Sequence, residues 1–109
     1  GNGKNGTSIL SPRAVELMQK TLLNAEQNAE FSQYHHGYSY GYGVRIMTDP
    51  DAVGSLIPKG TFGWDGSKMC FGFSDPNNKI AIFHAEHMGA VNSILIPRLM
   101  NVIYSCIEE

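Results

Sequence analysis

The chain has 109 residues, 42% of them hydrophobic, and a formal net charge of −2. This length and composition allow one domain with its own apolar core. A charge so close to zero excludes strong attraction to nucleic acid or anionic lipid, and no apolar run reaches the roughly 18 to 20 residues that span a bilayer.

The N-terminal region predicts an irregular start followed by a helix. Residues 1–8 are rich in Gly and Asn, so we expect a disordered start or a tag remnant, with the folded part at 9–109. Ser11-Pro12 is typical of a helix start, because the hydroxyl caps an N–H and proline suits the first helical position. Apolar residues at 15, 18, 22 and 25 predict one helix from Pro12 to Ala29.

An aromatic and glycine-rich stretch follows and leads into Val44-Arg45-Ile46-Met47. Its composition predicts a first strand from Tyr40 to Met47. Alternating tyrosines in this stretch would face one side, either covering the sheet or forming a platform for a ligand. Prolines predict a loop from Thr48 to Lys59.

Three further strands are predicted, over 60–66, 69–74 and 79–84, with a tight turn at Asp75-Pro76-Asn77-Asn78. Short connections between consecutive strands favour an antiparallel meander. A last helix is expected to start close to Pro97, because proline disrupts a helix interior. The predicted fold class is α+β: a three- to four-stranded antiparallel meander with an N-terminal and a C-terminal helix packed on it.

The order of these pieces resembles the C-terminal part of the serine β-lactamase, penicillin-binding protein and esterase superfamily, especially its class C-like members. The similarity rests on Ser11-Pro12, Gly41-Tyr42-Gly43, Phe62-Gly63-Trp64-Asp65-Gly66, the Asp75-Pro76 turn and the terminal helix, and it covers about residues 8–108. The resemblance implies a partial β-lactamase or transpeptidase-like fold.

The resemblance also implies the positions of a substrate site. Trp64-Asp65-Gly66 stands where the family has its third motif, usually Lys-Thr-Gly, and would bind substrate. The backbone N–H of Ser67 would form half of the oxyanion hole. Gly66 would leave room for a substrate against the strand edge.

Two further motifs of the family are missing from the sequence. No serine has a lysine three residues later, so Ser-x-x-Lys, which holds the nucleophile, is absent, and so is Tyr-x-Asn. We therefore expect no catalytic residue in this chain and no acyl transfer by it alone. Tryptophan in place of the motif lysine supplies no charge for a substrate carboxylate and favours an esterase-like relative.

Other candidate residues have simpler interpretations. His35-His36-Gly37 matches a His-x-Gly variant of the third motif, but it precedes the Gly-Tyr-Gly segment, so a pair of loop histidines is the better interpretation. His84 and His87 lack further ligands at zinc spacing, and no metal or other cofactor is expected. Cys70 and Cys106 are expected to be two buried free thiols, with a disulfide as the alternative.

Two functional hypotheses remain. The first is a fragment of a β-lactamase-related serine hydrolase that acts on a small ester, amide or peptide once the missing N-terminal part of the domain is present. The second is a non-catalytic binding or assembly module of the same fold that associates with itself through exposed strand edges. The resemblance implies the bacterial cell envelope or the extracellular space, and the cytoplasm remains an alternative.

Overall fold

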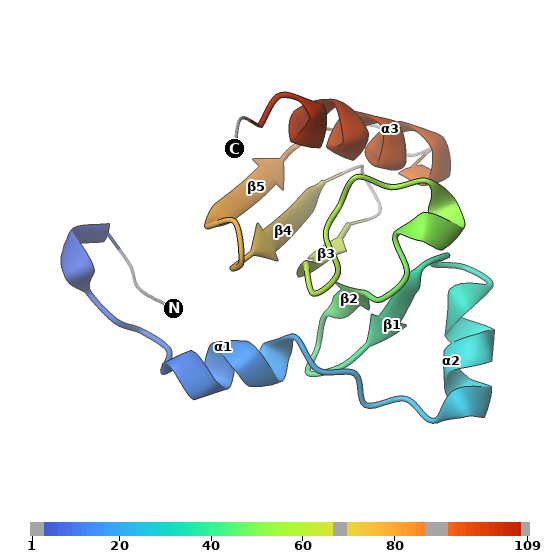
Figure 1. The fold of residues 1–109 in the computed structure, drawn as a ribbon, viewed down its shortest axis with the longest axis horizontal. Coiled ribbons are helices and arrows are strands. Elements are labelled where there is room, and N and C mark those ends of the chain that lie inside the picture. The colour runs from blue at the N-terminus through green and yellow to red at the C-terminus, as the bar shows by residue number, and fades with distance from the viewer. Residues whose placement is uncertain (1–3, 67–69, 87–91, 108–109) are drawn as a thin grey trace.

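The computed structural model describes residues 4–66, 70–86 and 92–107. Its centre is a five-stranded antiparallel sheet with the strand order β1-β2-β3-β4-β5, shown in Figure 1. The strands are β1 (Tyr38–Tyr40), β2 (Arg45–Met47), β3 (Phe62–Asp65), β4 (Phe71–Asp75) and β5 (Ile80–His84). The helices are α1 (Pro12–Met18), α2 (Ala25–Ser32) and α3 (Asn92–Ser105), with short 3-10 turns at Lys4–Gly6 and Asp51–Val53. The α+β class and the antiparallel meander are confirmed.

The strands β3, β4 and β5 lie where the sequence predicts them. Each end differs from its predicted position by no more than two residues. In β4, Phe71 and Phe73 are 1% and 3% exposed, whereas Gly72 between them is half-buried, so the side chains alternate between two faces. The turn after β4 is closed by Asp75, whose carboxylate accepts hydrogen bonds from the backbone N–H and the side-chain amide of Asn78. Short-range turn chemistry therefore sets this hairpin.

The predicted strand Tyr40–Met47 is wrong, because the segment forms the β1–β2 hairpin. Tyr40 pairs with Arg45, and the four residues between them form the turn. Gly43 has a φ of +78°, which breaks an extended strand and suits glycine. A side chain at Gly41 would overlap the carbonyl oxygen of Lys20. The extra hairpin raises the strand number to five and leaves Tyr42 in the turn, away from β1.

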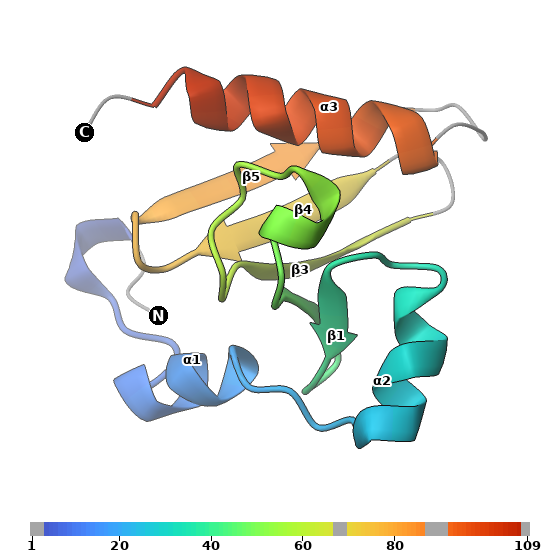
Figure 2. The same cartoon turned by 45° about the vertical axis from the view of Figure 1, so that its right-hand side comes forward.

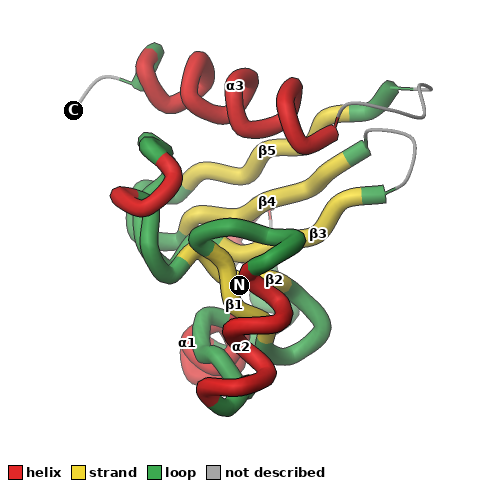
Figure 3. The backbone as a smooth tube through the Cα atoms, turned by 90° about the vertical axis from the view of Figure 1, so that its right-hand side faces the viewer, coloured by secondary structure: helices red, strands yellow, loops and turns green. Residues whose placement is uncertain are grey.

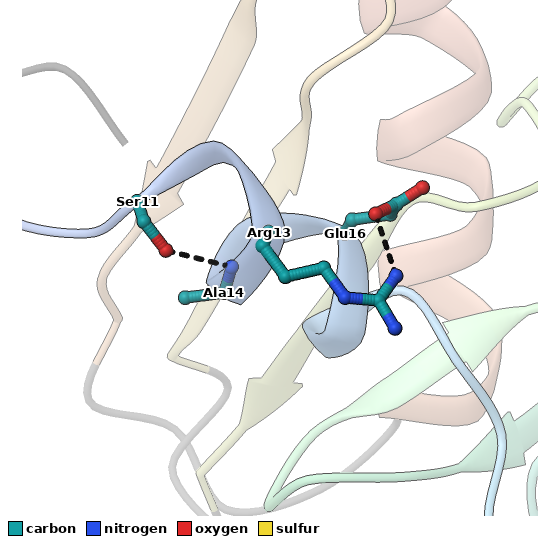
Figure 4. Close-up of polar contacts among 4 residues, drawn as sticks. All are labelled: Ser11, Arg13, Ala14 and Glu16. Carbon is teal, nitrogen blue, oxygen red and sulfur yellow. Dashed lines mark hydrogen bonds and ion pairs between the residues drawn. The ribbon is translucent and has the colours of Figure 1, made fainter.

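The predicted single helix Pro12–Ala29 is also wrong, since two helices are separated by residues 19–24. Ser11 caps α1 by accepting a hydrogen bond from the N–H of Ala14, and Arg13 pairs with Glu16 (Figure 4). Asn24 starts α2 with a capping box shared with Gln27. Between the helices, Leu22 donates its N–H to the carbonyl of Tyr40 over 2.9 Å. This contact with the sheet and the new cap end the helical pattern that the sequence suggests.

Helix α3 covers one face of the sheet, as Figure 2 shows, and encloses the main core. Buried residues of this core come from α3, β4, β2 and the loop before β3: Ile96, Met100, Phe71, Phe73, Met47 and Ile57. The prediction that α3 starts near Pro97 is wrong, because it begins at Asn92. Proline costs about 3 kcal/mol inside a helix. Burial of Ile96 and Met100 beside Pro97, at 5% and 1% exposed, offsets that cost.

The N-terminal helices lie at the β1 end of the sheet, away from α3 (Figure 3). α2 packs against β1, whereas α1 has no buried residue.

Within the described parts of the chain, no helix combines the length and apolar character needed to cross a membrane. Cys106 is exposed and Cys70 only half-buried, so the expectation of two buried thiols is wrong.

Candidate functional site

The centre of the candidate site is Arg45 on β2, a charged side chain in an otherwise apolar strand. The residue is only 6% exposed. Its Nη1 donates a hydrogen bond to Oδ1 of Asp65 on β3 and lies 3.1 Å from Nδ1 of His35. Arg45 therefore joins the β1–β2 hairpin, β3 and the loop after α2 at one point.

Aromatic rings surround the guanidinium group. Its central carbon lies 4.6 Å from the centre of the Tyr38 ring, 5.0 Å from that of Phe73 and 5.9 Å from that of Trp64. Arginine stacks well on aromatic faces because its charge is delocalised and weakly hydrated. These contacts and the Asp65 carboxylate make the burial of a full charge tolerable.

His35 connects the guanidinium to a second group of rings. Its imidazole stacks on Phe31 with 4.7 Å between ring centres and meets Trp64 at 5.5 Å. Tyr40 contacts Trp64 edge-on at 5.9 Å. Trp64 is thus held by rings from β1 and from the loop after α2, although 45% of its surface stays exposed.

The protonation of His35 follows from its neighbours. Burial, and then the positive charge of Arg45, lower the pKa of His35 below 6.5, and the Asp65 carboxylate opposes that shift. The ring is therefore neutral at pH 7. A guanidinium group can only donate hydrogen bonds, so Nδ1 of His35 accepts and the ring proton sits on Nε2. Burial likewise raises the pKa of Tyr38 and keeps its phenol protonated.

Arg45 has at least one donor without a partner among the described residues. Its short hydrogen bonds to Asp65 and His35 both leave from Nη1, and the hydroxyl of Tyr38 also interacts with the guanidinium. Its Nε is fully buried and has no acceptor among them. An unpartnered buried donor costs about 1–3 kcal/mol, and more on a charged group. Leaving the Nε donor of Arg45 buried without a described acceptor therefore lowers the stability of the fold.

The residues predicted from the third-motif resemblance are only partly brought into this site. Asp65 is there as the partner of Arg45, and Trp64 forms its exposed rim. Gly66 lies at the end of β3, where its N–H donates to the carbonyl of Cys70 over 2.6 Å. Ser67, the predicted oxyanion donor, lies outside the described residues.

Sequence reasoning missed Arg45 and the role of His35. One signal was present, since Arg45 is the single charge within Val44-Arg45-Ile46-Met47. A lone charge in a buried strand requires a partner. The partners Asp65 and His35 lie 20 and 10 residues away in sequence, so only the strand register identifies them.

The histidine at the end of β5 forms a separate pair. Nε2 of His84 lies 3.0 Å from a carboxylate oxygen of Glu86, and its ring stacks on Phe71. The described residues contain no group of three or more His, Cys, Asp or Glu side chains that could hold a metal ion. His87 lies outside the described residues.

Comparison of the sequence with protein-family models and with curated proteins gives no match.

Proposed function

We propose that this chain supplies the third-motif wall of a β-lactamase-related serine hydrolase, with the nucleophile carried by another segment. One observation carries the proposal: the pairing between β2 and β3 ends at Gly63, whereas β3 pairs with β4 as far as Asp65. On its β2 side, the last part of β3 thus lies beyond the ladder. A strand edge of this kind can bind an extended substrate through backbone hydrogen bonds.

The chemistry that follows is acyl transfer in two steps. The oxygen of a serine in Ser-x-x-Lys attacks the substrate carbonyl while its proton passes to a neighbouring base. The resulting oxyanion accepts a hydrogen bond from the backbone N–H of Ser67, and the leaving group departs as the alcohol or amine. Water then attacks the acyl-enzyme, releases the acid and restores the serine.

The charges at the site support an uncharged substrate. Trp64 stands where the superfamily has a lysine, and Arg45 is already neutralised by Asp65. No net positive charge is therefore offered to a substrate carboxylate by these residues. Esters and uncharged amides suit the site better than β-lactams, which carry a carboxylate.

The test uses the complete natural reading frame that contains these 109 residues. A fluorophosphonate probe is expected to label that protein at a serine in Ser-x-x-Lys, whereas the 109-residue chain stays unlabelled. Trp64→Lys should shift preference from an uncharged ester toward a substrate with a carboxylate. A reading frame without Ser-x-x-Lys that also shows no labelling would exclude the proposal.

A second candidate is a self-associating module, and the sheet edge favours it. Among the described strands, β5 pairs with β4 alone, and Phe83, the fourth residue of β5, is 79% exposed. Uncovered apolar edge strands pair readily with other chains. Light scattering should then detect a dimer that Phe83→Lys dissociates, and a clean monomer at high concentration would argue against this candidate.

A further inference from the structure

The structure contains a cavity beside Arg45, with a volume of about 440 Å³. It lies between α3, the β1–β2 hairpin and the loop around Asp51–Val53. Small-molecule sites have volumes of about 300–1,000 Å³, mostly apolar walls and a few polar groups. The volume of this cavity lies in that range, and its lining also combines apolar side chains with a few polar groups.

The apolar wall is the inner surface of the core. Met47, Ile57, Ile96 and Met100 line it, and each is at most 5% exposed. The polar wall is formed by Arg45, Asp65 and His35. A ligand that enters would therefore meet aliphatic groups on one side and hydrogen-bonding groups on the other.

The donors of the polar wall outnumber the acceptors that the described residues offer. A guanidinium has five N–H donors; the short hydrogen bonds of Arg45 to Asp65 and His35 use only Nη1, and the hydroxyl of Tyr38 also interacts with the group. His35 adds an Nε2–H, and no hydrogen bond of Nε2 to a described residue is found. Both side chains line the cavity, so an oxygen acceptor placed there would meet donors that have no partner among residues 4–66, 70–86 and 92–107.

The charges decide which acceptor suits the cavity. Asp65 neutralises Arg45, and His35 carries no charge at pH 7, so the wall has no net positive charge. A carboxylate would be desolvated close to Asp65 without a free cation to balance it. A neutral carbonyl oxygen accepts the same hydrogen bonds without that cost.

We propose that this cavity binds a small, mainly apolar molecule that presents an uncharged carbonyl oxygen to Arg45 and His35. The apolar body contacts Met47, Ile57 and Met100, and the carbonyl reaches the unused donors. This inference goes beyond the proposed acyl transfer, because it needs no nucleophile and concerns a cavity under α3.

The test is a nuclear magnetic resonance titration of the 109-residue chain with three probes of similar shape. Benzamide carries a neutral carbonyl, benzoate a carboxylate and toluene no acceptor. Benzamide is expected to bind about tenfold more tightly than toluene and more tightly than benzoate. It should shift the Nη–H resonances of Arg45 and the methyl resonances of Met47 and Met100.

Two valine variants locate the binding. Val53 lines the cavity and is 41% exposed, so Val53→Trp can fill the space without replacing a core residue. Val102 on α3 is 59% exposed and does not line the cavity, so Val102→Trp is the matched control. Benzamide binding should weaken about tenfold in the first variant and stay unchanged in the second.

Four results would overturn the inference. Equal affinity for benzamide and toluene would show that no carbonyl is recognised. Tighter binding of benzoate would contradict the neutral acceptor. Resonance shifts away from Arg45 and the two methionines, or equal binding by both valine variants, would place the site elsewhere. None of these results bears on whether a serine in a longer protein is acylated.

Discussion

Tyr104 donates a hydrogen bond of 2.9 Å to Asp75, and this bond fastens the last turns of α3 to the end of β4. Asp75 is 2% exposed and also accepts two hydrogen bonds from Asn78. One carboxylate thus closes the β4–β5 turn and holds the helix that covers the core.

Tyr104→Phe removes this bond and keeps the ring. Asp75 retains its bonds to Asn78, so the free energy of unfolding should fall by about 1–2 kcal/mol. Urea unfolding followed by circular dichroism measures the change. Tyr34→Phe, at a residue that is 80% exposed, is the matched control and should leave stability unchanged.

The same tyrosine predicts a loss of stability at high pH. Burial, and then the hydrogen bond to Asp75, raise the pKa of Tyr104 from 10.0 to about 12. Unfolded chains release this proton near pH 10, so the stability present below that pH is lost as pH rises toward 12. Over this pH range, the free energy of unfolding should decrease less for Tyr104→Phe than for the parent chain. If it decreased equally in the two proteins, Tyr104 would not be the group responsible.

The lowered pKa of His35 predicts that the folded state loses stability at low pH, in contrast to the effect of Tyr104 at high pH. Because its pKa is lowered from 6.5 in the folded chain, the unfolded chain takes up the proton more readily. Stability present above pH 6.5 should therefore be lost as the pH falls below that value. His35→Gln, whose side-chain carbonyl can still accept from Arg45, should show a smaller fall in thermal denaturation over the same range.

The Arg45–Asp65 pair predicts strong coupling between β2 and β3. Arg45→Met leaves the Asp65 carboxylate in a site where its side chain is 16% exposed. Removing one partner of a buried pair costs about 3–5 kcal/mol. The double change Arg45→Met with Asp65→Leu should recover part of that loss. Additive losses in a double-mutant cycle of unfolding free energies would show that the two side chains act independently.

Alanine substitutions at Gly63 in β3 and at Gly66 just after it should have different effects on stability. A Cβ at Gly63 would overlap the carbonyl oxygen of Gly72 and lie 2.8 Å from Cα of Phe73, so Gly63→Ala should destabilise the sheet by about 1–3 kcal/mol or more. Among the described residues, the atom nearest to a Cβ at Gly66 would lie 3.8 Å away. The melting temperature of Gly66→Ala should therefore be close to that of the parent chain. Equal melting temperatures for the two variants would contradict the pairing of β3 with β4.

The sequence predicts those parts of the fold that depend on neighbouring residues. β4, the Asp75 turn and β5 are found within two residues of their bounds, because side-chain alternation and turn chemistry are local. The break after Met18 depends on contacts between Leu22 and Tyr40 and between Gln19 and Gly60. The Arg45 site depends on strand register in the same way. Long-range contacts of this kind leave little trace in a local pattern.

The strand order β1-β2-β3-β4-β5 has a consequence for the speed of folding. Every strand pairs with its neighbour in sequence, so the sheet can grow by successive hairpins with short loops to close. Helix α3 must also reach far back along the chain, where Asn101 bonds to Leu56 and Gly54 and Met100 belongs to the same core as Met47. Its docking is the step with the largest loop-closure entropy, and until it occurs Phe71 and Phe73 face water.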